Sequence, residues 1–183
     1  MIYVHLAEGF EEVEAITVVD LLRRAEIEVK TVSIMDDRRV IGAHGVTIQA
    51  DLLFEEADYD ACDMIVLPGG MPGALHLKNH DDLGEKIMEF AMEGKNLAAI
   101  CAAPMALDAR GALKHKTATI YPGMQEELHM ASYIDCGVVE DGNVITSKGP
   151  AYAIDFGLAI IRKVKGQETS DEVAQGLLYR GMI

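Results

Sequence analysis

The chain has 183 residues, half of them hydrophobic, and a formal net charge of −14 at pH 7. A negative charge of this size repels phosphate backbones and anionic lipids, so the composition argues against nucleic-acid and membrane-surface partners. The length suits one domain over residues 1–183, and its Val, Ile, Leu and Ala are typical of a parallel sheet with helices on both faces.

The three cysteines, Cys62, Cys101 and Cys136, form no CxxC pair and have no spacing to histidine that is typical of a metal site. Met1 leads directly into a predicted strand, without the pattern of a signal peptide, and no apolar run is long enough to span a membrane. We therefore expect a cytoplasmic protein without metal or cofactor.

The first predicted unit is a strand over residues 2–6 and a helix from about residue 11 to residue 25. Glu11 and Glu12 fall in the first turn, where carboxylates complement the helix dipole. Glu14 instead falls on the face that is otherwise apolar. A carboxylate buried there must be paired or protonated, which makes Glu14 a candidate acid-base residue. The alternative is that Glu14 lies at the edge of this face and reaches water.

A strand over residues 28–34 follows, and then a small hairpin over residues 40–48 that we expect to extend the main sheet, with His44 in solvent at its tip. An apolar strand over residues 63–67 ends in the glycine loop 68–73. Glycines at the carboxyl end of a parallel strand bring backbone N–H groups close to a ligand, although a plain turn uses the same residues. The loop lacks the Lys and Ser/Thr of a phosphate-binding loop, so nucleotide binding is not supported.

The stretch from Leu97 to Pro104 is a short strand that stops at Cys101 and continues as a helix. Ala99 and Ala103, two residues before and after the cysteine, are small, as a strained strand-to-helix turn that presents a nucleophile requires. The positive end of the helix is expected to lower the pKa of the thiol. A buried structural cysteine is the alternative that this pattern leaves open.

A helix over residues 82–93, capped by Gly94, precedes this turn. After it, a strand over residues 116–120 is expected to bring Tyr121 to the ligand edge of the sheet, where it would face Cys101; a tyrosine in a surface turn is equally ordinary. The remaining predicted elements are a hairpin over 138–146, a long helix opened by residues 147–150, and a last helix capped by Ser170 with Val173, Leu177 and Leu178 on its apolar face.

Five motifs, in the same order and at matching spacings, resemble the ThiJ/PfpI (DJ-1/PfpI) superfamily, and within it the clade of the parkinsonism-associated protein deglycase. They are residues 8–14, 23–25, 67–73, 99–104 and 146–150. The resemblance spans nearly the whole chain. It implies an α/β, flavodoxin-like fold, with a doubly wound and mostly parallel sheet, helices on both faces and small β-hairpin additions. It also implies a homodimer.

The resemblance further implies the roles of the site residues. Cys101 would be a reactive thiolate, and Glu14 a protonated glutamate that is hydrogen-bonded to it. The backbone N–H groups of Gly70 and Ala102 would form the oxyanion hole. Possible accessory residues are Gly69, Tyr121, Arg24, Gly149 and Pro150.

Two positions depart from the family pattern. Tyr121 stands where many members carry a histidine, which argues against a relay from cysteine to histidine. His44 stands where an arginine often reaches the site from the partner subunit, while Arg24 is retained, so affinity for anions is expected to be weaker.

The function that the resemblance implies is cysteine-dependent detoxification of reactive carbonyls, of the glyoxalase or protein deglycase type, on small aldehydes or glycated side chains. Cys101 would be the nucleophile and Glu14 the acid-base residue. The alternative is a non-enzymatic sensor of oxidative stress, or a chaperone, that acts through oxidation of Cys101. A glutaminase is disfavoured because no His-x-Glu pair follows Cys101, and a PfpI-type peptidase because Ala102 stands where a histidine is usual.

Overall fold

A computed structural model describes residues 1–181 of the chain. Its main sheet contains the strands β1 (Ile2–Leu6), β2 (Val29–Ser33), β5 (Leu52–Leu53), β6 (Met64–Leu67), β7 (Asn96–Ile100), β10 (Val138–Asp141) and β11 (Val144–Ser147). Their order is β10-β11-β7-β6-β1-β2-β5, and every neighbouring pair is parallel except β10 with β11. The predicted flavodoxin-like α/β class is confirmed.

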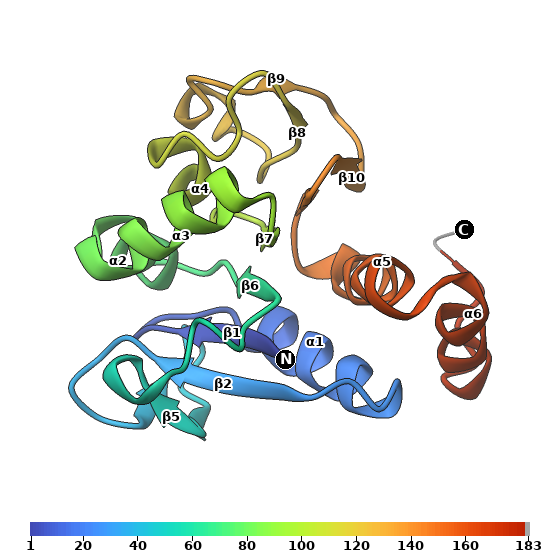
Figure 1. Ribbon diagram of the computed structural model, residues 1–183. Coiled ribbons are helices and arrows are strands. Elements are labelled where there is room, and N and C mark those ends of the chain that lie inside the picture. Colours follow the sequence, from blue (N-terminus) through green and yellow to red (C-terminus); the bar gives the residue numbers. More distant parts are fainter. Residues whose placement is uncertain (182–183) are drawn as a thin grey trace.

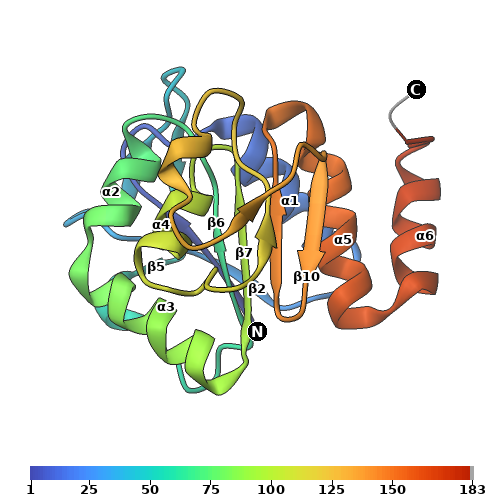
Figure 2. The ribbon, with the colours of Figure 1, turned by 90° about the horizontal axis from the view of Figure 1, so that it is seen from above.

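Helices cover both faces of this sheet (Figure 1). They are α1 (Glu12–Arg24), α2 (Gly73–Asn79), α3 (Asp81–Glu93), α4 (Pro104–Ala109), α5 (Ala153–Lys165) and α6 (Gln167–Gly176). Helices α1 and α5 pack together on one face, and α2, α3 and α4 cover the other. Helix α6 packs against the outer side of α5 (Figure 2). Among residues 1–181, no helix combines the length and the apolar character needed to cross a bilayer.

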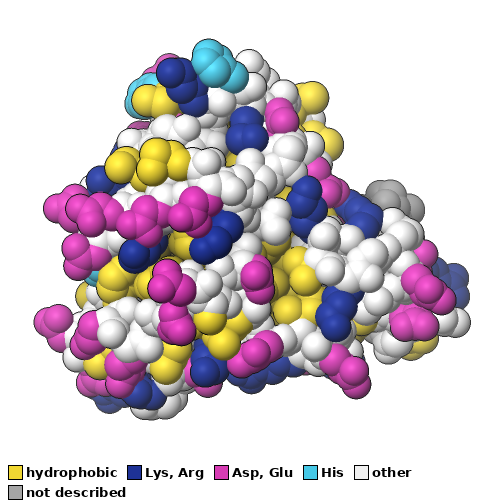
Figure 3. All heavy atoms as spheres, in the orientation of Figure 1, with side chains coloured by type: hydrophobic (Ala, Val, Ile, Leu, Met, Phe, Trp, Pro, Cys, Tyr) yellow, Lys and Arg dark blue, Asp and Glu magenta, His cyan; other side chains and the backbone are white. Residues whose placement is uncertain are grey.

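The buried central strands show why the sheet is covered on both sides. In β6, Met64 and Val66 belong to the core on the α1 and α5 face, while Ile65 and Leu67 belong to the core on the α2 to α4 face. Successive strand side chains point to opposite faces, so a wholly apolar run fits only between two helical layers. Most charged side chains remain outside, and Figure 3 shows Lys and Arg interspersed among Asp and Glu on one face.

Two parts of the predicted sheet were wrong. The hairpin β3 (Arg39–Ile41) and β4 (Thr47–Gln49) forms a separate two-stranded sheet and does not extend the main one. The strand expected over residues 116–120 shrinks to β8 (Thr117–Ala118), which pairs in parallel with β9 (Ser132–Tyr133) outside the main sheet. In the main sheet, β11 takes the position next to β7 instead.

Three helical boundaries also differ from the predictions. The glycine loop leads straight into α2, a helix that the sequence pattern does not predict because Pro and Gly mask its start. Ser147 ends β11, and a 3₁₀ turn over Pro150–Tyr152 precedes α5. Ser170 lies inside α6, where its hydroxyl donates to the carbonyl of Leu158 at 3.0 Å, so it is not a cap. Leu178 lies beyond α6 and is exposed.

Candidate active site

Cys101 lies at the sharp turn between β7 and α4. Its φ is 61°, in the left-handed region that residues other than glycine rarely adopt. The turn is held on both sides, because the Cys101 N–H donates to the Ser147 carbonyl and the Cys101 carbonyl accepts from the Tyr121 N–H, each at 2.9 Å. The residue is 8% exposed. The strained turn that the small neighbouring residues predicted is therefore present.

The glycine loop after β6 packs directly against this turn. A Cβ atom on Gly69 would lie 2.5 Å from the Cβ of Cys101 and 2.8 Å from Oε2 of Glu14, so only glycine fits. Gly70 has a φ of 87°, which also favours glycine. The backbone N–H groups of Gly70 and Ala102 act on the sulfur of Cys101 and lower the pKa of its thiol. The two backbone donors that the resemblance implies thus both lie near the sulfur of Cys101.

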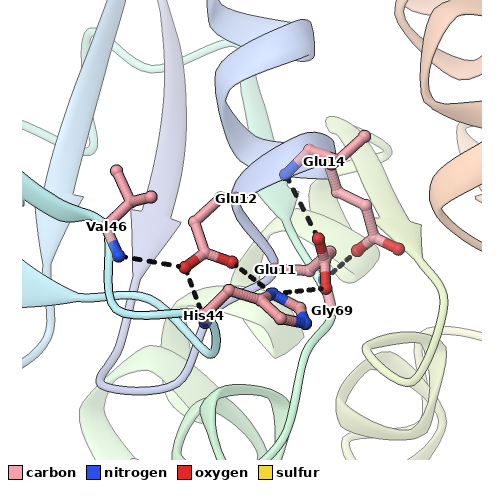
Figure 4. A network of polar contacts seen from close by, with 7 residues as sticks. Glu11, Glu12, Glu14, His44, Val46 and Gly69 are labelled. Carbon is pink, nitrogen blue, oxygen red and sulfur yellow. Dashed lines mark hydrogen bonds and ion pairs between the residues drawn. The ribbon is translucent and has the colours of Figure 1, made fainter.

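Glu14 is fully buried on α1, and Figure 4 shows its carboxylate beside Gly69 of the glycine loop. Its Oε2 accepts the Gly69 N–H at 2.7 Å, and the Glu11 N–H donates to the Gly69 carbonyl at 2.9 Å. Oε1 of Glu14 is buried and has no hydrogen-bond partner in the described part of the chain. The burial of Glu14 that its place on the apolar face of the helix predicted is confirmed, and the alternative of a carboxylate that reaches water is wrong.

The carboxyl of Glu14 and the thiol of Cys101 influence each other's protonation. Burial raises the pKa of Glu14 to about 7, against the hydrogen bonds of Gly69 and Cys101, which lower it. Burial also raises the pKa of Cys101, and negative charge on Glu14 raises it further, while the Gly70 and Ala102 N–H groups lower it. The predicted low pKa of the thiol is therefore wrong, since burial outweighs the helix end, and α4 has only six residues.

Besides Gly69, the possible accessory residue Tyr121 lies at this turn, for a reason that differs from the predicted one. Tyr121 follows no strand of the main sheet, but its N–H bonds to Cys101, and its ring lies 3.4 Å from the position of a Cβ on Gly149. Pro150 follows Gly149 directly. Tyr121 is 46% exposed, so it borders the site on the solvent side.

Arg24 is not part of the site within this chain. It lies at the opposite end of α1, about 15 Å along the helix axis from Glu14 at 1.5 Å per residue. There its guanidinium pairs with Asp20 at 2.6 Å.

Glu12 is a polar residue of this region that sequence reasoning undervalued. It is buried, and its Oε1 accepts the N–H groups of His44 at 2.7 Å and Val46 at 3.3 Å. The sequence predicts His44 in solvent; its side chain is 71% exposed, but Nδ1 lies 2.8 Å from Oε2 of Glu12. One sequence signal for this contact is the glycine at position 42 of the hairpin turn. A Cβ there would overlap the Glu12 side chain, so Glu12 can lie under the hairpin only because residue 42 is glycine.

Comparison with known proteins agrees with this geometry. The model of the DJ-1/PfpI family matches residues 1–163. Drosophila melanogaster protein dj-1beta is 39% identical over 175 residues, which are 94% of each chain. Arabidopsis thaliana protein DJ-1 homolog B is 36% identical over 178 residues, 97% of this chain. This chain spans less than half the length of that plant protein and of the plant DJ-1 homolog A.

Solved structures of DJ-1 proteins are also similar to this chain over nearly its full length. Drosophila DJ-1beta superposes with a TM-score of 0.94 at 38% identity, and oxidised Toxoplasma gondii DJ-1 with a TM-score of 0.93 at 33% identity. Each comparison covers 98% of both chains. The chain belongs to the DJ-1/PfpI family.

Proposed function

We propose that this protein is a cysteine-dependent enzyme that converts small reactive carbonyls, of the glyoxalase or deglycase type, with Cys101 as nucleophile and Glu14 as acid-base residue. The observation that carries the proposal is the convergence of three features on one sulfur. These are a strained turn, a buried carboxyl and two backbone N–H donors. Membership of the DJ-1/PfpI family supports a function of the DJ-1 type.

The first step joins the sulfur of Cys101 to the aldehyde carbon of a dicarbonyl such as methylglyoxal. Because the pKa of the buried thiol is raised, Glu14 takes the thiol proton as the C–S bond forms. The π electrons of the C=O bond move to oxygen, and the N–H groups of Gly70 and Ala102 are available to stabilise that negative charge. Glu14 then returns the proton to this oxygen, which gives a neutral hemithioacetal.

The second step moves hydrogen between the two adjacent carbons. Glu14, again ionised, takes the proton from the carbon bonded to sulfur, which leaves an enediolate. Glu14 returns this proton to the neighbouring carbon, while the hydroxyl proton on the first carbon passes to the oxygen of the neighbouring carbon. One carbon is oxidised and the other reduced, so no external oxidant or reductant is needed. The product is a thioester of lactate on Cys101, and water hydrolyses it to lactate and the free thiol. Early adducts of the same aldehydes on protein side chains offer an equivalent carbon for attack.

The test is lactate formation from methylglyoxal by thiol-reduced protein in the absence of glutathione. We expect turnover by the wild type, none above background by Cys101→Ser, and an unchanged rate for Cys136→Ser, which removes an exposed cysteine outside the site. Absence of turnover in the wild type would refute the proposal. If such protein gained two oxygen atoms on Cys101 in dilute peroxide, the oxidative sensor would be the better account.

A further inference from the structure

The turn that carries Cys101 is held between two segments, and the ring of Tyr121 reaches from one to the other. The Cys101 N–H donates to the carbonyl of Ser147 at the end of β11, and the Tyr121 N–H donates to the Cys101 carbonyl, each at 2.9 Å. One edge of the Tyr121 ring lies against Gly149, because a Cβ there would be 3.4 Å from Cδ2 and 3.6 Å from Cε2. Gly149 is two residues beyond Ser147, so the ring spans the two supports of Cys101.

A substituent on the reacting carbonyl has to leave the site on the side of this ring. The inner side of the Cys101 turn is filled, since a Cβ on Gly69 would overlap both Cys101 and Glu14. Tyr121 is 46% exposed. The other residues that act on this turn are buried or lack a side chain, and they are Glu14, Gly69, Gly70, Ala102 and Ser147. The substituent of a dicarbonyl bonded to the sulfur therefore extends toward solvent and meets Tyr121.

Backbone hydrogen bonds fix the position of Tyr121 before any substrate binds. The Thr119 N–H donates to the hydroxyl oxygen of Thr146 at 3.0 Å, and both threonines are buried. The Met124 N–H donates to the Tyr121 carbonyl at 3.0 Å and closes a turn over residues 121–124, in which Pro122 has a restricted φ. A side chain held in this way loses little further conformational freedom when a ligand packs against it.

We propose that Tyr121 is a specificity-determining residue that selects α-oxoaldehydes with an aromatic substituent, of which phenylglyoxal is the simplest. Two aromatic rings gain more from offset-stacked or edge-to-face contact than from burial of apolar area alone. A methyl group in the same place covers little of the Tyr121 ring. This inference rests on the proposed function and names the substrate class of the same site; Tyr121 itself moves no proton.

The first test compares turnover of phenylglyoxal to mandelate with turnover of methylglyoxal to lactate. Discrimination is the ratio of the two kcat/KM values. We expect this ratio to fall roughly three- to tenfold in Tyr121→Ala, the scale of one lost aromatic contact. Tyr121→Phe keeps the ring and should keep the ratio. The matched control is Met92→Ala, which removes an 81% exposed apolar side chain from α3 and should also leave the ratio unchanged.

The second test does not depend on turnover. The sulfur of Cys101 displaces bromide from 2-bromoacetophenone or from bromoacetone, and in both reagents the carbon attacked is next to a carbonyl. The two differ only in the substituent, which is phenyl or methyl. Each rate, measured on the Cys101 peptide by mass spectrometry, is divided by the rate with a small free thiol. The phenyl-to-methyl ratio at Cys101 should fall in Tyr121→Ala by a similar factor and stay unchanged in Tyr121→Phe and Met92→Ala.

An unchanged ratio in folded Tyr121→Ala, in turnover or in alkylation, would overturn the proposal. An equal fall in Tyr121→Phe would overturn it too, since the hydroxyl and not the ring would then be responsible. If the wild type turns over neither dicarbonyl, the proposed function fails, while the alkylation ratio still decides the role of Tyr121. Circular dichroism confirms the fold of each variant, and Tyr121→Ser carries both tests if Tyr121→Ala does not fold.

Discussion

Replacement of Gly69 by alanine tests how tightly the glycine loop and the Cys101 turn are packed. The added Cβ would lie 2.5 Å from the Cβ of Cys101, whereas carbon atoms in contact prefer about 3.5–4.0 Å. The backbone must therefore move by roughly 1 Å, and a shift of this size at a reacting centre costs about a hundredfold in rate. Overpacking of this kind also lowers the free energy of unfolding by about 1–3 kcal/mol.

The assay combines methylglyoxal turnover with urea unfolding of Gly69→Ala and Gly176→Ala. A Cβ on Gly176, at the end of α6, would meet no atom within 4 Å, so this control should keep wild-type turnover and lose no stability. Wild-type turnover and stability in Gly69→Ala would refute the packing that we describe between Gly69, Glu14 and Cys101.

Two further predictions concern stability and assembly. Burial lowers the pKa of His5 to about 3, so the unfolded state binds more protons than the folded state between pH 6.5 and 3. The free energy of unfolding should therefore fall by ~1.4 kcal/mol per pH unit as the pH drops through this window. Urea unfolding at pH 6.5 and pH 5 should show this slope in the wild type and a smaller one in His5→Leu; equal slopes would contradict it. We also predict a homodimer, since Val13 and Ile16 of α1 are exposed. Light scattering should give about twice 19.9 kDa, and a monomer mass would exclude it.

Local patterns in the sequence were sufficient to predict those parts of the site that depend on a single helix or turn. The spacing of Glu14 on an apolar helix face predicted its burial, because helical periodicity fixes which face a residue occupies. The small residues around Cys101 predicted the strained turn, since sterics leave few choices there. The high content of Val, Ile, Leu and Ala likewise predicted a sheet covered on both faces, and the two cores confirm it.

Features that depend on contacts between distant segments could not be predicted in this way. Tyr121 reaches Cys101 through a backbone hydrogen bond from a loop, although the strand expected to place it lies outside the main sheet. The contact of Glu12 with His44 joins residues 32 apart in sequence and needs the hairpin to fold back. The raised pKa of Cys101 follows from the depth of burial, which no local pattern specifies.

The most direct test of the pairing of Glu14 with Cys101 is to measure thiol reactivity and turnover together in Glu14→Gln. Glutamine keeps a hydrogen-bond donor and removes the negative charge that raises the pKa of Cys101, so alkylation of Cys101 at pH 8, followed by peptide mass spectrometry, should be as fast as in the wild type or faster. Glutamine moves no protons, so methylglyoxal turnover should fall roughly a hundredfold or more. Normal turnover in Glu14→Gln, or loss of both alkylation and turnover in a folded variant, would contradict the account.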